Sequence, residues 1–247
     1  MKDFKIKFRS IASSSKGNCY LLEGHKTKIL IEAGIPVKKI DEALDHQLHS
    51  IDACFVSHKH KDHSKALFEV AAKGVDVYAL KETLEDYPKH HRYNALKYKN
   101  VEDGRAYGSI HVGEFKINPF PVDHDVENAG FLISSSLSGE KLLFIIDTYY
   151  CKYRFTGVTY YAIECNYSAE ILKENAEKSD LSKKYLNRIY KSHFSLENLC
   201  DFFDANDLSD CKEIYTLHMS EGNGDAKLFK NVIETKTGKP VTVCEAN

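Results

Sequence analysis

The chain lacks the features that mark membrane-bound, secreted and strongly basic proteins. Its 247 residues carry 34 lysines and arginines against 36 aspartates and glutamates, which gives a formal net charge of −2. A protein that follows a long nucleic acid usually carries a basic excess, so this balance favours a small substrate. No apolar run approaches the ~20 residues of a membrane helix, and the N-terminus shows no secretory segment. We therefore expect a cytoplasmic protein without a membrane partner.

Paired cysteines and segments of biased composition are also missing. The seven cysteines form no Cys-x-x-Cys pair and lie mostly in apolar segments, so we expect reduced core thiols. This excludes a disulfide framework and a cysteine-zinc site. The five prolines and 13 glycines are scattered, and no low-complexity tract divides the chain. We therefore predict one domain over residues 1–247, a length that layered α/β folds reach as a single unit.

What the chain does contain is a dense histidine motif, Ser-His-Lys-His-Lys-Asp-His at residues 57–63. It follows the apolar residues 51–56, which indicate a buried strand, so its side chains emerge where a strand ends. The first two histidines lie on one side of an extended backbone and can share one metal ion. A helix expected from residue 64 directs the following Asp-His pair toward a different point in space. One motif can therefore serve two neighbouring ions, since imidazole and carboxylate suit zinc, manganese or iron. The predicted ligands in it are His58, His60, Asp62 and His63.

Three later residues at predicted strand ends complete the candidate metal shell. His124 has a carboxylate on each side and is predicted to join the first ion. Asp147 ends the apolar stretch 142–146, where an unpaired carboxylate is costly to bury and two bridged cations explain its presence. A turn or helix-cap role is the alternative for Asp147. His218 ends an apolar strand, whereas His193 follows a basic, helix-like segment, so we assign His218 to the second ion.

The hydrophobic pattern predicts strands that alternate with helices in two halves. A basic and aromatic segment, 87–99, is expected to be either a solvated loop or a local phosphate-binding surface. Helices are predicted near 37–48, 64–73, 169–179, 181–190, 225–234 and from 195. Strands are predicted near 4–11, 19–23, 28–32, 51–57, 75–79, 115–121, 129–135, 141–147, 158–164, 213–217 and 240–243.

The His-x-His-x-Asp-His motif at a strand end resembles the signature of the metallo-β-lactamase superfamily. The serine-rich turn at 12–18 and the motifs around Asp147, Glu164, His193 and His218 fall in the order shown by its WalJ/YycJ-like branch. The resemblance covers nearly the whole chain and implies a four-layer αββα sandwich, an α/β fold that the predicted element order allows. It also implies a metal-dependent phosphodiesterase. We expect two divalent ions as cofactors, with zinc favoured and manganese as the alternative.

The expected reaction assigns roles to several side chains. Asp62 is expected to orient a water that two metal ions activate. His193 is expected to steady charge on the departing oxygen, with a helix-capping role as the alternative. The aromatic and basic segment after Asp147 suits base stacking and phosphate pairing, and an ordinary amphipathic connection is its alternative. The predicted substrate contacts are Tyr149, Tyr150, Lys152, Tyr153, Arg154 and Asn166.

The substrate expectation depends on charge. The WalJ/YycJ resemblance implies a 5′ to 3′ DNA exonuclease, whereas the similar phage anti-Pycsar phosphodiesterases hydrolyse cyclic mononucleotides as homodimers. The near-neutral chain favours a cyclic mononucleotide, hydrolysed to a linear monophosphate by a homodimer, and DNA is the alternative. A non-nucleotide metallohydrolase and a metal-binding module are further alternatives. Departures from the family pattern, such as Glu32 and Ser192, are expected to flank the substrate pocket rather than the ions.

Overall fold

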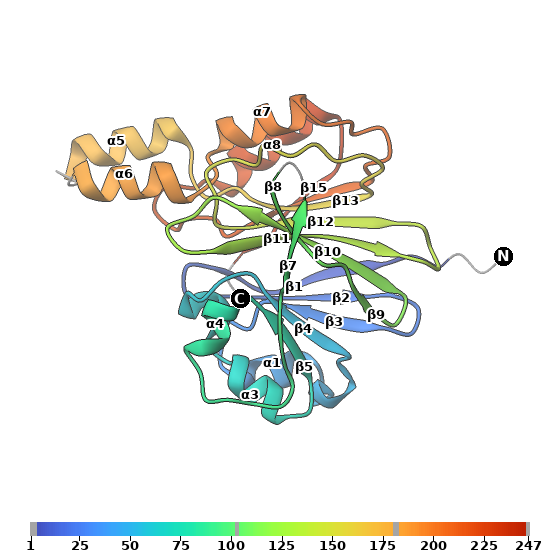
Figure 1. Ribbon diagram of the computed structural model, residues 1–247. Coiled ribbons are helices and arrows are strands. Elements are labelled where there is room, and N and C mark those ends of the chain that lie inside the picture. Colours follow the sequence, from blue (N-terminus) through green and yellow to red (C-terminus); the bar gives the residue numbers. More distant parts are fainter. Residues whose placement is uncertain (1–3, 102–103, 180–182, 246–247) are drawn as a thin grey trace.

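Two mixed β-sheets lie face to face in the computed structural model, and helices cover both outer faces (Figure 1). The structure describes residues 4–101, 104–179 and 183–245. This arrangement confirms the predicted αββα sandwich. Within these ranges, no helix is both long and apolar enough to cross a membrane.

The N-terminal sheet contains six strands in chain order. The first three strands pair antiparallel, and the remaining pairs are parallel. Helices α1 and α3 lie on the outer face of this sheet (Figure 1). The strands are β1 (Lys7–Ser14), β2 (Gly17–Glu23), β3 (Lys28–Ile31), β4 (Ala53–Val56), β5 (Asp76–Ala79) and β6 (Tyr93–Ala95). The helices of this half are α1 (Val37–Ala43), a 3₁₀ turn η1 (Leu48–Ser50), α2 (Lys61–Ser64), α3 (Leu67–Ala72) and α4 (Lys81–Glu85).

The C-terminal sheet contains seven strands in the order β15-β14-β13-β12-β11-β10-β9, and a separate hairpin pairs β7 with β8. Helices α7 and α8 cover its outer face, while α5 and α6 form a pair that projects to one side (Figure 1). The strands of this half are β7 (Tyr98–Val101), β8 (Gly104–Tyr107), β9 (Ile110–Val112), β10 (Phe115–Val122), β11 (Asn128–Ser135), β12 (Lys141–Ile145), β13 (Tyr160–Glu164), β14 (Glu213–Leu217) and β15 (Val241–Val243). Its helices are α5 (Ala169–Ser179), α6 (Lys183–Ser192), α7 (Leu196–Asp204) and α8 (Ala226–Thr237).

Three apolar layers hold the sandwich together. Between the sheets, Tyr20 meets Phe144 at a ring-centroid distance of 5.4 Å and Phe55 meets Phe131 at 5.8 Å. All four rings are fully buried, and burial of such side chains is the main favourable term in folding. The two outer layers join each sheet to its helices, with Leu30, Ile40, Leu67 and Val70 in one and Ile145, Tyr161, Phe202 and Phe229 in the other.

The fold brings the predicted site residues to one edge. The strands β3 to β6 run parallel, as do β12 to β15, so the carboxyl ends within each set meet at the same edge of their sheet. The histidine motif follows β4, Asp147 follows β12, and His218 follows β14 directly. Strand ends, rather than a long active-site loop, therefore position the candidate ligands.

The structure corrects several predicted boundaries. The first helix ends at Ala43 instead of 48, because Asp45 and His46 adopt left-handed backbone with φ of 51° and 61°. The helix predicted over 64–73 is shorter, at α3, and a separate turn of helix, α2, begins earlier and contains Asp62 and His63 of the histidine motif. The segment 87–99 contains β6 and enters β7, so it is partly strand and not only a loop. The predicted start of a helix at residue 181 lies outside the described residues.

Candidate functional site

The first group of candidate ligands combines three imidazoles with one carboxylate. Ligand atoms of His58, His60, His124 and Asp147 all lie within 4.8 Å of one another. His60 Nδ1 lies 3.1 Å from His58 Nε2 and 3.3 Å from His124 Nε2. A neutral imidazole carries one N–H, so three converging nitrogens cannot satisfy one another by hydrogen bonds. One cation would satisfy all three.

The second group shares Asp147 with the first. Its members are Asp62, His63, Asp147 and His218, again with ligand atoms within 4.8 Å of one another. Asp147 Oδ2 lies 3.2 Å from His63 Nε2 and 3.4 Å from His58 Nε2, so one oxygen faces both groups. His218 Nε2 lies 3.5 Å from Asp62 Oδ2. The structure thus brings together all seven residues that the sequence suggested as ligands, in the predicted division.

The chemistry of these atoms fits divalent cations. Among the described residues, His218 Nε2 is buried without a hydrogen-bond partner, as is Asp147 Oδ1. Burial holds the pKa of His58 well below its ordinary value, which keeps the imidazole neutral and able to ligate. Burial also opposes ionisation of Asp147, but the imidazoles of His218 and His63 outweigh it and hold its pKa well below the usual range. The surrounding carboxylates outweigh burial and raise the pKa of His63 and of His218 well above the ordinary value, so a bound cation would displace a proton from each ring. Carboxylate and deprotonated imidazole together are a ligand set for zinc or manganese.

Glu164 supports the two histidines that follow it in the chain, a role that the sequence did not reveal. The fully buried Glu164 Oε1 lies 2.7 Å from His193 Nδ1 and 2.9 Å from His218 Nδ1. Its other oxygen accepts the backbone N–H of Phe194 at 3.1 Å. A carboxylate behind a histidine fixes the ring and leaves the opposite nitrogen free to act. The available signal was a glutamate that ends a buried strand.

His193 has a partly exposed side chain, at 18%, and among the site histidines only His60, at 29%, is also exposed to this extent within the described residues. Burial lowers its pKa, but Glu164 and Asp147 outweigh burial and raise that pKa to about 9. With Nδ1 held by Glu164, only Nε2 remains to meet a bound molecule. His193 also belongs to a third group of possible ligand atoms, with Asp147, Glu164 and His218, which lie within 4.8 Å of one another. The His193 Nδ1 atom in this group is the one that Glu164 holds, whereas His218 Nε2 faces Asp62 in the second group.

Glu32 supports the motif histidines from the neighbouring strand of the same sheet, since it follows β3 and the motif follows β4. Its carboxylate is fully buried, lies 3.6 Å from His63 Nδ1 and accepts the Ser57 backbone N–H at 3.3 Å. Ser57 Oγ in turn lies 2.9 Å from His58 Nδ1. The expectation that Glu32 flanks the substrate pocket was therefore wrong, because its longer side chain reaches behind a candidate ligand. Ser192 does line a cavity, as expected.

Backbone strain is concentrated at the site. Glu32, Asp147 and His218 adopt positive φ values of 66°, 50° and 53° directly after or close to strand ends. Each such residue costs about 1–3 kcal/mol unless its surroundings enforce the conformation. Asn128 provides part of this support, since its buried amide donates to the carbonyls of Ile146 and Asp147 at 2.9 and 2.7 Å. The strained turns place Asp147 and His218 in the ligand groups and Glu32 beside His63.

The serine-rich turn near the N-terminus forms the floor of the site. Asn18 Nδ2 donates to the Asp62 carbonyl at 3.3 Å and lies 3.3 Å from His63 Nε2. Ser13 Oγ accepts the backbone N–H of His218 at 2.9 Å. Tyr20 joins the two by donating to Asn18 Oδ1 at 3.0 Å and contacting Ser13 Oγ at 2.8 Å. This network connects the second ligand group to both sheets.

An open cavity of about 600 Å³ lies beside His124. Two of its lining residues, Tyr149 and Tyr190, are 42% exposed and are among the most exposed large hydrophobic side chains of the described residues. Its wall also includes Lys191 on α6. We call this space the aromatic cavity. Tyr190 and Lys191 escaped the sequence analysis because their helix lies far along the chain from the histidine motif.

The other predicted substrate contacts lie elsewhere. Tyr150, Lys152 and Tyr153 line a separate, smaller cavity of about 40 Å³, and the Tyr153 ring packs against Phe120 at 5.6 Å. Arg154 donates to the carbonyls of Lys152 and Tyr153, both at 3.3 Å. Asn166 is buried and donates to the His218 carbonyl at 2.7 Å, so it supports a candidate ligand. Of the predicted set, Tyr149 alone lines the aromatic cavity.

Comparisons with known proteins agree with this geometry. The β-lactamase superfamily domain matches residues 27–180. The exodeoxyribonuclease WalJ of Streptococcus pneumoniae is 27% identical over 239 residues, which cover 92% of this chain and 87% of that protein. The exodeoxyribonuclease YycJ of Bacillus anthracis is 25% identical over 240 residues, which cover 91% and 86%. The metallo-β-lactamase fold protein YhfI of Bacillus subtilis superimposes with a TM-score of 0.71 over 98% of this chain and 97% of that one, at 14% identity.

The family match, the superposition and the ligand groups support the same assignment. The family match spans more than half of the chain and includes the histidine motif at 57–63. The superposition on YhfI shows that the layered fold extends over nearly the whole chain. The ligand groups lie at the strand ends where the motif predicted them. The chain belongs to the metallo-β-lactamase superfamily and is a metal-dependent hydrolase.

Proposed function

We propose that the chain is a two-metal phosphodiesterase that removes nucleotides from the end of a DNA strand. The observation that carries this proposal is the aromatic cavity beside His124, where two exposed tyrosine rings lie next to a ligand group for metal. Exposed rings stack on bases of single strands without regard to sequence. Relatives along nine-tenths of the chain are named exodeoxyribonucleases, which supports the same substrate.

We propose the ligand division that the two groups suggest. One ion would be held by His58, His60 and His124, the other by Asp62, His63 and His218, and Asp147 would be shared. Zinc is the favoured metal and manganese the alternative, since both accept this mixed nitrogen and oxygen set. Two such ions supply Lewis-acid stabilisation of the phosphate and a water of lowered pKa.

The chain's own residues would direct the rest of the reaction. Asp62 remains ionised, because the histidines around it outweigh burial and hold its pKa below the usual range, so it would orient the attacking water by accepting a hydrogen bond from it. His193 presents its free Nε2 to the departing oxygen and can donate a proton there. Tyr149 and Tyr190 would position the base next to the scissile phosphate.

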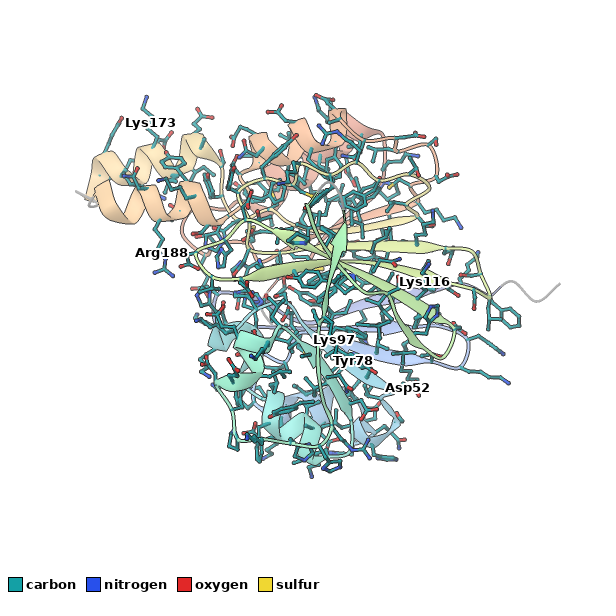
Figure 2. The ribbon with its side chains drawn as sticks, in the orientation of Figure 1. Asp52, Tyr78, Lys97, Lys116, Lys173 and Arg188 are labelled. Carbon is teal, nitrogen blue, oxygen red and sulfur yellow. The ribbon has the colours of Figure 1, made fainter. Side chains whose placement is uncertain are left out.

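The helix pair α5–α6 extends the proposed strand path. Arg188 projects from α6 on the side that faces the N-terminal half, whereas Lys173 projects from the opposite side of the pair (Figure 2). Arg188 is exposed and stands three residues before Lys191 of the cavity wall, a spacing that puts both side chains on one face of α6. A strand that leaves the aromatic cavity along α6 would pass Arg188. Replacing Arg188 by alanine should therefore weaken DNA binding, and Lys173→Ala is the matched control.

A cyclic mononucleotide is the second candidate substrate, and charge supports it. The net charge of −2 provides little general attraction for a polyanion. The aromatic cavity, at about 600 Å³, also lies within the size range of small-molecule pockets. This enzyme would convert the cyclic diester to a linear monophosphate. The homodimer expected from the anti-Pycsar resemblance stays a prediction, which size-exclusion chromatography with light scattering tests.

One experiment separates these substrates. Metal-loaded protein is incubated in parallel with phosphorylated single-stranded DNA, cyclic mononucleotides and cyclic dinucleotides, and the products are identified by chromatography. We expect mononucleotides from DNA, with a rate that falls steeply as salt increases. Hydrolysis of cyclic mononucleotides alone, with little dependence on salt, would replace the DNA proposal by the second candidate.

We also propose that residues 1–247 act as one domain, since both sheets contribute to the site.

A further inference from the structure

A second open cavity, of about 520 Å³, lies beside the second ligand group. Its walls include Asp62 and three lysines, Lys16, Lys61 and Lys65. The aromatic cavity, by contrast, has one lysine and lies beside His124 of the first group. The two cavities therefore adjoin different ends of the paired ligand groups. We call the second space the lysine cavity.

Two of the three lysines repel each other. Lys61 and Lys65 are four residues apart, and the Lys65 backbone N–H donates to the Lys61 carbonyl at 3.0 Å, so both stand on one helical turn. Like charges at this spacing destabilise a helix. The Lys61 ammonium lies 4.1 Å from the centre of the Tyr87 ring, which helps to hold the cation in place. An anion between the two lysines would remove the repulsion.

The third lysine, Lys16, can exchange its present partner, Glu221, for a bound anion. Lys16 Nζ contacts Glu221 Oε1 at 2.6 Å, but the two side chains are 75% and 60% exposed. Pairs this exposed contribute little to stability, so a phosphate can take the place of Glu221. Asp62 is the acidic group of the cavity wall, and a metal ion at the second ligand group would offset its charge. The floor is rigid, since Gly34 packs directly against the Asp62 backbone.

We propose that the lysine cavity binds the terminal phosphate of the DNA strand whose neighbouring phosphodiester is cut at the metal groups. This inference rests on the exonuclease function proposed above. A terminal monoester carries about −1.5 to −2 charge, more than an internal diester, so three cations favour the strand end. Holding the end on one side of the metals, with stacked bases on the other, restricts cleavage to the terminal position. A cyclic mononucleotide, with one phosphate, cannot occupy both places.

The test compares strand ends. Single-stranded oligonucleotides that differ only in a 5′-phosphate or a 5′-hydroxyl are hydrolysed by the wild-type protein and by Lys65→Gln, Lys16→Gln and Lys116→Gln. Lys116 is exposed and lies at the end of β10 remote from His124 (Figure 2), so its variant controls for lost charge. Binding of a hydrolysis-resistant phosphorothioate version of each strand is measured by fluorescence anisotropy.

We expect the wild type to bind and cleave the 5′-phosphorylated strand with the lower KM. Lys65→Gln and Lys16→Gln should raise that KM, and weaken binding, on the order of 10-fold, and should reduce the salt slope of binding by about 0.7. Both variants should treat the 5′-hydroxyl strand as the wild type does, and Lys116→Gln should change nothing. Equal use of both ends by the wild type, or equal losses on both strands, would overturn the lysine cavity and leave the exonuclease proposal intact. Failure to cleave either strand, with hydrolysis of cyclic mononucleotides, would overturn both.

Discussion

Alanine substitutions of His193 and His218 should distinguish the roles of two histidines whose rings contact the same carboxylate, that of Glu164. Both Nδ1 atoms lie within 3.0 Å of Glu164 Oε1, and the ring centroids are 5.5 Å apart. Only His218 turns a buried, unpartnered Nε2 toward Asp62 among the described residues. We therefore expect His218→Ala to lose metal and His193→Ala to keep it.

The magnitudes follow from these positions. Loss of a residue that merely orients a ligand lowers metal affinity 10- to 100-fold, about 1.4–2.7 kcal/mol, and loss of a ligand should cost more. His218→Ala should therefore retain about one metal per chain after gel filtration, where the wild type retains about two. His193→Ala should retain about two but lose on the order of 10²-fold in kcat, about 2.7 kcal/mol of transition-state stabilisation.

Elemental analysis of gel-filtered protein measures the metals, and steady-state kinetics on the identified substrate measures kcat. Circular dichroism of each variant confirms that it is folded. His91→Ala serves as a control, because His91 is exposed and belongs to neither ligand group. Metal loss in His193→Ala with full retention in His218→Ala would show that the two roles are assigned backwards.

Three further results are expected. Tyr149→Ala and Tyr190→Ala should each raise KM about 5- to 150-fold and change kcat less, since stacking on a base contributes about 1–3 kcal/mol to ground and transition states alike; a loss confined to kcat would contradict a stacking role. Gly34→Ala should lower the Tm by several degrees, because a Cβ would meet the Asp62 carbonyl oxygen at 1.6 Å, whereas Gly222→Ala meets nothing within 4 Å and should melt like the wild type. Excess chelator should abolish hydrolysis, and His60→Ala should reduce the metal content below about two ions per chain; full activity of the chelated protein would refute the metal centre.

The sequence by itself determined most strands and helices and the candidate ligands, and the resemblance of its motifs to the metallo-β-lactamase superfamily implied the layered fold. Apolar runs of strand length, such as 142–146, indicate burial locally, so most strands and helices could be predicted without tertiary information. The elements α4 and β6 to β9, between residues 81 and 112, were missed because the sequence there shows no such run. The histidine motif packs four candidate ligands into six residues after one such run, and His218 directly ends another. A polar residue that ends a buried strand is costly without a partner, which is why these positions could be identified in advance.

Only the tertiary structure decided which residues support those ligands and what surrounds them. Glu164 meets His193 and His218 across 29 and 54 residues of chain, and no local pattern predicts such contacts. Glu32 was expected to flank the substrate pocket, but the pairing of β3 with β4 places its carboxylate beside His63. The aromatic and lysine cavities likewise join segments distant in sequence. Burial is encoded residue by residue, whereas the identity of each neighbour depends on how the two sheets pack.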